Sequence, residues 1–176
     1  MQRISALLLF ATLGGCTATG EAQRPAVVVA AVGKVIDGLT AETQQRQTTD
    51  VFRGLPVVVR NGAAEGAETV VAEMLRTRLT ERGVTVEVAC PAKCLEITLI
   101  EFVTETTGQL TPGQLMPVGA TGLPGLPLMP AGPATLAPGQ ASALLATFAS
   151  RDGNRYGARQ QLIAILAVAK RAEPPR

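Results

Sequence analysis

The chain contains no histidine, and this absence removes several classes of chemistry. Catalysis that uses an imidazole as acid or base, including Ser-His-Asp and Cys-His arrangements, is excluded. The usual zinc and iron sites lose a main ligand as well. Aromatic residues make up only 3% of the chain, with no tryptophan and one tyrosine, so valine, leucine and alanine must build the core.

Charged residues are also few, at 17% of 176 residues, whereas hydrophobic residues reach 47%. This composition is too apolar for an intrinsically disordered chain, and the length suits one domain. A net charge of +2 provides no strong basic field for nucleic acid. The sequence therefore predicts one folded domain without a nucleic-acid partner.

The N-terminus has the form of a secretion signal. Arg3 precedes an uncharged, mostly apolar run of ten residues from Ile4 to Leu13, and Gly14, Gly15 and Cys16 follow. A spanning helix needs about 20 apolar residues, so this run is too short to cross a membrane stably. A positive start, an apolar stretch and small residues before a cleavage point are typical of a signal peptide.

Leu13-Gly14-Gly15-Cys16 also resembles the lipobox of bacterial lipoproteins. The resemblance implies that residues 1–15 are removed, that the Cys16 thiol receives a diacylglyceryl group, and that the new amino terminus is acylated, with palmitate as the expected acid. Thr17 in place of Asp implies the inner leaflet of the outer membrane, facing the periplasm. Several acyl chains would hold the protein on the membrane. An ordinary signal peptide with an incidental cysteine, or a transmembrane anchor, remain the alternatives.

The other two cysteines, Cys90 and Cys94, are separated by only three residues. In an oxidising compartment this pair is expected to form a disulfide across one tight turn. A metal site would need more ligands than two thiols supply, and a redox-active pair usually has the closer CxxC spacing. We therefore expect a structural disulfide that fixes a turn.

Two segments have the periodicity of helices. After a lipidated tether at 16–24, a helix is expected from Pro25, with an apolar face of Val28, Val32, Val35, Ile36 and Leu39. The polar run 41–50 either prolongs this helix or forms a loop, and a strand at 27–29 stays open. The second helix spans 63–82 before Gly83, with a stripe of Val70, Val71, Met74, Leu75 and Leu79.

Five strands are expected, at 55–59, 84–88, 95–105, 143–150 and 156–169. The segment from Cys90 to Cys94 is expected to join the second and third strands as a hairpin. Both faces of 95–105 are partly apolar, which indicates a central strand. Asp152-Gly153-Asn154 is a turn signal that joins the last two strands, with 162–168 as the buried part. A helix at 159–171 competes with the last strand.

Residues 108–140 differ from the rest, with seven Pro and seven Gly in 33 residues and no charge. So long a loop in a compact domain is either functional or disordered. Because apolar side chains without charge suit contact with a partner or a bilayer, the expected interaction residues are Leu115, Met116, Leu123, Leu126, Leu128 and Met129.

The expected fold class is α+β: one mixed sheet of about five strands, two helices on one face, and a long Gly/Pro-rich loop. The domain layout is a signal peptide at 1–15, the tether at 16–24, a single periplasmic domain at 25–171 with the flexible loop 108–140 inserted, and a disordered tail at 172–176.

No catalytic set emerges from the residues. Ser142 and Ser150 have no Lys or His beside them, and Glu96 and Glu101 fall on opposite faces of one strand. Glu87 could approach either carboxylate across the sheet, but a solvated face explains it. Gly-rich phosphate motifs are absent as well. We expect neither an enzyme nor a bound metal or cofactor.

A lipid tether followed by a small α+β domain resembles several envelope lipoproteins: conjugal-transfer lipoproteins of the TrbH type, curli-secretion lipoproteins of the CsgG type, and accessory lipoproteins for lipopolysaccharide transport. The shared element is the helix and strand at 68–86. The resemblance implies an assembly subunit of a secretion, transfer or surface-export machine, with protein partners in the cell envelope and a homo-oligomer also open. The alternative is a module that binds a lipid or small ligand, with 108–140 as its lid.

Overall fold

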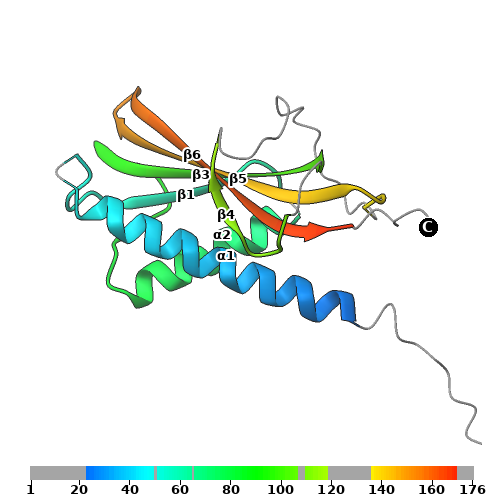
Figure 1. Ribbon diagram of the computed structural model, residues 1–176. Coiled ribbons are helices and arrows are strands. Elements are labelled where there is room, and N and C mark those ends of the chain that lie inside the picture. Colours follow the sequence, from blue (N-terminus) through cyan, green and yellow to red (C-terminus); the bar gives the residue numbers. More distant parts are fainter. Residues whose placement is uncertain (1–22, 50, 65, 107–109, 119–135, 170–176) are drawn as a thin grey trace, which may run out of the picture.

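Two helices and six strands make up the described part of the chain (Figure 1). The computed structural model describes residues 23–49, 51–64, 66–106, 110–118 and 136–169, with side chains of the first helix from Val29 onward. In chain order the elements are α1 (Gln23–Gln47), β1 (Val57–Asn61), α2 (Ala67–Glu81), β2 (Val86–Glu87), β3 (Lys93–Glu105), β4 (Leu115–Pro117), β5 (Gln140–Asp152) and β6 (Arg155–Val168).

The strands form one mixed sheet in the order β2-β1-β3-β5-β6-β4. β1 is parallel to both of its neighbours, and the β3–β5, β5–β6 and β6–β4 pairs are antiparallel. Both helices lie on one face, with α1 against β6 and α2 against β1 and β3 (Figure 1). The predicted α+β class is confirmed. The sheet has six strands rather than about five, because β4 comes from within the segment 108–140.

The helix expected from Pro25 forms, and it continues through the polar run to Gln47. Two buried threonines explain this extension. Thr40 and Thr43 donate their hydroxyl hydrogens to the carbonyls of Ile36 and Leu39, each at 2.7 Å, so polar side chains enter the core with their hydrogen bonds made. The strand alternative at 27–29 is wrong.

The second helix is shorter than expected, because it begins at Ala67 rather than at residue 63. Gly66 precedes it with φ 124°, a conformation that favours glycine and ends the turn after β1. Its buried face contains Val71, Leu75 and Leu79 as predicted. Val70 and Met74, assigned to the same stripe, are 53% and 42% exposed; Glu68 and Ala72 are buried instead.

The expected hairpin between 84–88 and 95–105 is wrong. Val57 pairs with Val86 on one side and with Leu95 on the other, so β1 separates β2 from β3. β2 contains only two residues. Val84, which was expected to begin this strand, instead completes the C-terminal cap of α2: its backbone N–H donates to the Leu79 carbonyl at 3.0 Å. Alternation therefore identified a strand without identifying its partner.

The C-terminal hairpin is confirmed, and the competing helix at 159–171 is wrong. β5 and β6 pair from Asp152↔Arg155 at the turn to Ala141↔Val168 at the far end. Gly153 in the turn has φ 55°. A register shift between Ala149 and Arg151 marks a bulge near the turn.

Apolar side chains form a cluster on each face of the sheet. The larger cluster lies between the sheet and the helices, with contributions from α1, α2, β1, β3, β5 and β6. β3 supplies Leu95, Ile97 and Leu99 to it. The smaller cluster lies on the opposite face and contains Phe102, Ala143, Leu145, Ile163 and Ile165. β3 is therefore the central strand that its two apolar faces predicted.

Candidate functional site

Cys90 and Cys94 form the predicted disulfide, with Cα atoms 5.5 Å apart. Cys94 is fully buried at the start of β3. The bridge closes the loop through which the chain passes from β2 to β3. In the same loop the Ala92 carbonyl accepts a hydrogen bond of 2.8 Å from the Gly153 N–H. The disulfide loop thus supports the turn of the β5–β6 hairpin.

Leu115 and Met116, predicted to be interaction residues, belong to β4 and are half-buried. Both Cδ atoms of Leu115 lie 3.0 Å from the position that a Cβ on Gly38 would take, so this side chain packs directly on α1. Met116 pairs with Ile163 and packs on the cluster around Phe102. Both side chains therefore hold β4 in place, and the contact with a partner that the sequence predicts for them stays a prediction.

The other predicted site residues lie outside the described part of the chain. They are the lipidation residue Cys16 and the four apolar residues Leu123, Leu126, Leu128 and Met129. Their roles stay predictions.

Glu96 anchors a polar cluster on the sheet face opposite the helices. Arg60 Nε and an Arg151 guanidinium nitrogen each lie 3.1 Å from Glu96 Oε2, and the Tyr156 hydroxyl donates to Oε1 at 3.3 Å. The carboxylate is buried, and two cations with a hydroxyl satisfy it. Glu87 lies beyond β1 from Glu96, since both pair with Val58.

Glu101 and Glu68 hold the start of α2 against the sheet. Glu101 Oε2 accepts a hydrogen bond of 2.9 Å from the Ala67 N–H, the first residue of α2, and Oε1 accepts one from the Ser142 hydroxyl at 2.9 Å. Glu68 Oε2 in turn accepts the N–H of Glu101 at 2.7 Å. Gly66, at the N-cap position, has no side chain that could cap the helix, and the Glu101 carboxylate from β3 therefore takes this role. Glu68 and Glu101 thus each have a structural partner.

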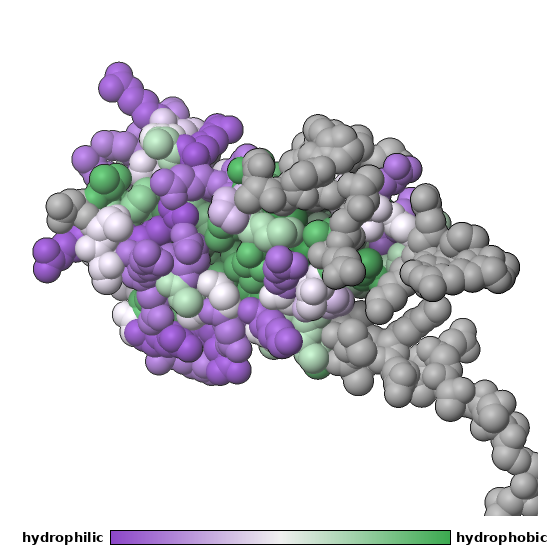
Figure 2. Space-filling view, viewed as in Figure 1, coloured by the Kyte–Doolittle hydropathy of each residue, from purple (hydrophilic) through white to green (hydrophobic). Residues whose placement is uncertain are grey.

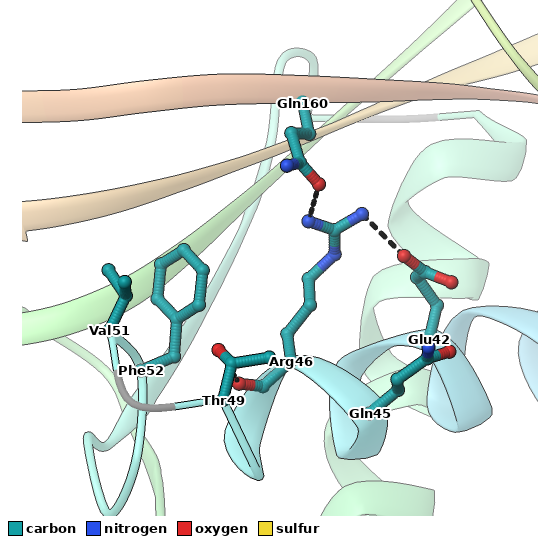
Figure 3. A pocket seen from close by; sticks show the side chains of 7 residues that line it. All are labelled: Glu42, Gln45, Arg46, Thr49, Val51, Phe52 and Gln160. Carbon is teal, nitrogen blue, oxygen red and sulfur yellow. Dashed lines mark hydrogen bonds and ion pairs between the residues drawn. The ribbon is translucent and has the colours of Figure 1, made fainter.

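A cleft of about 340 Å³ opens between the C-terminal end of α1 and β6 (Figure 3). Arg46 forms its centre: the guanidinium binds Glu42 on the preceding helical turn and Gln160 on β6. The same group lies over the Phe148 ring, 4.6 Å from its centroid. Arg46 is thus held from three sides, and it joins helix to sheet. The lining residues are Glu42, Gln45, Arg46, Thr49, Val51, Phe52 and Gln160.

Beside this cleft, the first half of β6 is open on its outer edge. Residues 155–161 are all exposed, and β4 with its flanking residues bonds to β6 only from Gln161 to Ile165. Among the described residues, no strand pairs with the outer edge of 155–160. Figure 2 shows hydrophilic side chains gathered at this end of the molecule, where α1 ends, and hydrophobic ones nearer the middle.

Sequence reasoning missed this edge and the cleft. One signal was present: 155–161 contains none of the large apolar residues that fill 162–168. A strand whose first half is polar on both faces reaches past the core. The contact between Arg46 and Gln160 joins residues far apart in the chain, and no local pattern predicts it.

Within the residues that the structure describes, no three Cys, Asp or Glu side chains lie close enough to hold a metal ion together. None of the described helices is long and apolar enough to cross a membrane. No family model, curated protein or solved structure matches the chain.

Proposed function

We propose that this chain is a lipoprotein of the outer membrane, anchored through Cys16, whose α+β domain faces the periplasm and binds a protein partner within an envelope assembly. Secretion, conjugal transfer and surface export are the kinds of machine that the sequence resemblance favours. The observation that carries the binding role is the open edge of β6 beside the Arg46 cleft. An exposed strand edge offers backbone donors and acceptors to another chain.

The anchor and the domain are close in the sequence. Six residues, 17–22, separate Cys16 from the start of α1 at Gln23. Fully extended, a segment of this length spans roughly 20 Å. A lipid on Cys16 would therefore keep the amino end of α1 near the membrane. Val29, near that end, is 71% exposed.

The described side chains favour binding over chemistry. The buried carboxylates Glu68 and Glu96 have structural partners, and Arg46 at the cleft is neutralised by Glu42. A lipid or small-ligand module remains the second candidate from the sequence. The 340 Å³ cleft does not add support for it, because none of the described residues that line it comes from the proposed lid at 108–140.

Metabolic labelling tests the anchor. Cells that express the tagged chain are fed an alkyne analogue of palmitate, and the purified protein is coupled to a fluorophore. Wild type should label, and Cys16→Ser should not. The double variant Cys90→Ser with Cys94→Ser is the matched control, because it removes thiols elsewhere and should keep the label. Unlabelled wild type, or labelled Cys16→Ser, contradicts the proposal.

Mild cross-linking in intact cells, detergent extraction and mass spectrometry test the assembly role. A defined set of envelope proteins at fixed ratio supports it, and a lone monomer contradicts it. The four apolar residues outside the described part stay in this proposal as a second contact. Replacing Leu123, Leu126, Leu128 and Met129 by serine leaves β4 untouched, so a loss of partners with unchanged thermal unfolding would assign the contact to them.

A further inference from the structure

β4 shows how the groove between β6 and α1 accepts a strand. Leu115, Met116 and Pro117 run antiparallel to β6. At each end of this pairing the backbone bonds continue: the Gly113 N–H donates to the Ile165 carbonyl at 2.7 Å, and the Val118 N–H to the Gln161 carbonyl at 3.1 Å. One side chain, Leu115, points from β4 into the groove and meets α1 at Gly38.

The same groove continues beyond the end of this pairing. Past Gln161, the outer edge of β6 has no neighbouring strand in the described part of the chain. The wall on the helix side continues as well, through Glu42 and Arg46 of α1 and Thr49 just after it, and the cleft lies between this wall and Gln160 (Figure 3). Val51 is 69% exposed beside it, and Phe52 is half-buried. An incoming strand would therefore find the arrangement that β4 already uses, with apolar contacts in place of Gly38.

The cleft is rigid before anything binds. Arg46 is fixed by Glu42, by Gln160 and by the Phe148 ring. Because its charge is matched by Glu42, the cleft itself favours an uncharged side chain. Preorganised walls reduce the entropy lost on binding.

Charge at this edge selects the partner. Arg155 and Arg159 have no ion-pair partner among the described residues; the Arg159 guanidinium rests on the Tyr156 ring, 5.4 Å from its centroid. The neighbouring acids are already engaged, Glu96 by two arginines and Asp152 by Lys93 at 3.0 Å. The edge thus carries two unmatched positive charges and attracts acidic side chains.

These charges oppose pairing with a second copy. Two β6 edges paired antiparallel would bring Arg155 and Arg159 of both copies onto one short ladder, where like charges destabilise the pairing. The repulsion between these arginines leaves a heterologous strand as the occupant.

We propose that the edge of β6 at 155–160 binds an extended segment of a partner protein as an added antiparallel strand. The segment carries both apolar and acidic residues. An apolar side chain enters the cleft at Val51 and Phe52, and acidic side chains meet Arg155 and Arg159. This inference rests on the proposed function, since it names the mode and the chemistry of the partner that the assembly role requires.

Photo-cross-linking in intact cells tests the mode of binding. p-Benzoyl-phenylalanine replaces Arg155, Ala158 or Gln161 in three separate versions of the full, lipidated chain, and mass spectrometry maps each adduct. Antiparallel addition predicts adducts within one stretch of one partner, and the adduct moves toward the partner's N-terminus as the probe moves from 155 to 161. The stretch should contain both apolar and acidic residues. A probe at Thr80, exposed on α2, is the control and should give no adduct there.

Charge variants test the chemistry with the probe at Ala158. Arg155→Glu with Arg159→Glu should lower the adduct yield about ten-fold, because two attractions become repulsions at exposed sites. Arg155→Lys with Arg159→Lys should keep most of the adduct yield, because both positive charges remain. Arg78→Glu with Arg82→Glu changes the net charge equally on α2 and should leave the yield unchanged.

Several outcomes overturn the inference. They are adducts in residues 119–135 of the same chain, adducts in β6 of a second copy, adducts that do not shift in order with the probe, and a yield insensitive to charge reversal. Absence of adducts while the envelope proteins still co-purify overturns the β6 site and leaves the proposed function standing. Failure of co-purification in wild type contradicts the proposed function itself.

Discussion

Leu115 occupies the space that Gly38 leaves open on α1. Both Cδ atoms of Leu115 lie 3.0 Å from the position of a Cβ at residue 38, and the helix and the edge strand approach each other through this contact. A helix interior loses about 1 kcal/mol when glycine stands in place of alanine. Here the loss allows β4 to join the sheet.

Gly38→Val should lower the free energy of unfolding by about 1–3 kcal/mol, because the new methyl groups overlap Leu115 in a packed groove. Gly33→Val is the matched control on the same helix, since nothing lies within 4 Å of a Cβ there, and it should be neutral or slightly stabilising. Thermal or urea unfolding measures both. Adding Leu115→Ala to Gly38→Val should restore part of the loss; strict additivity of the two changes would refute the contact.

Glu101→Ala should cost about 1–2 kcal/mol, because it removes the acceptor for the first N–H of α2 and for the Ser142 hydroxyl. Glu101→Gln should lose less stability than Glu101→Ala, since the amide oxygen still accepts one hydrogen bond. Glu87→Ala, on exposed β2, serves as the control and should change little. Chemical denaturation measures the stability, and hydrogen exchange at Ala67 reports the cap. Equal effects of the Glu87 and Glu101 variants would argue against a capping role.

Reduction of the Cys90–Cys94 bridge should lower stability by about 2 kcal/mol or less, because a disulfide across so short a loop removes little entropy from the unfolded chain. Urea unfolding with and without a reductant measures the difference. The double variant Cys90→Ser with Cys94→Ser should lose all dependence on the reductant. Complete unfolding on reduction would contradict this prediction, because it would show that the disulfide contributes most of the free energy of unfolding.

Phe102→Ala should destabilise the protein by about 3–5 kcal/mol, because Phe102 is fully buried in the cluster on the face opposite the helices. A chain of this size loses roughly 2–4 °C in Tm for each kcal/mol. Val88→Ala is the comparison, since Val88 is 97% exposed and should leave Tm nearly unchanged. A small effect at Phe102 would show that this second cluster contributes little to folding.

Local patterns predicted much of the fold. The apolar spacing of Val35, Ile36 and Leu39, and the turn at Gly153, act within a few residues, so the first helix and the last hairpin were found. The partner of β2 was not, because alternation at 84–88 is the same whichever strand lies beside it. β4 was missed for a related reason. Its three residues lie in a Gly/Pro-rich segment, and they form a strand only because they pair with β6 and because Leu115 packs against Gly38.

The candidate site was less accessible from sequence than the fold. The disulfide follows from the spacing of two cysteines, and it is confirmed. The cleft depends on Arg46, Phe148 and Gln160, which meet only after β5 and β6 have closed over α1. Leu115 and Met116 were read as free contacts, since an apolar residue in a polar or Gly-rich segment has the same sequence signature whether it packs inward or outward.

The order of pairing in the sheet has a consequence for the time course of folding. β3 pairs with β5 along its whole length, between residues as far apart as Lys93 and Asp152, and β6, which packs on α1, is the last strand of the chain. Pairing between distant segments slows folding, because the loop must close before its contacts repay the cost. The face of α1 that packs on β6 thus stays uncovered until the last strand of the chain has been synthesised. We expect the native packing of α1 to be completed only after synthesis of β6.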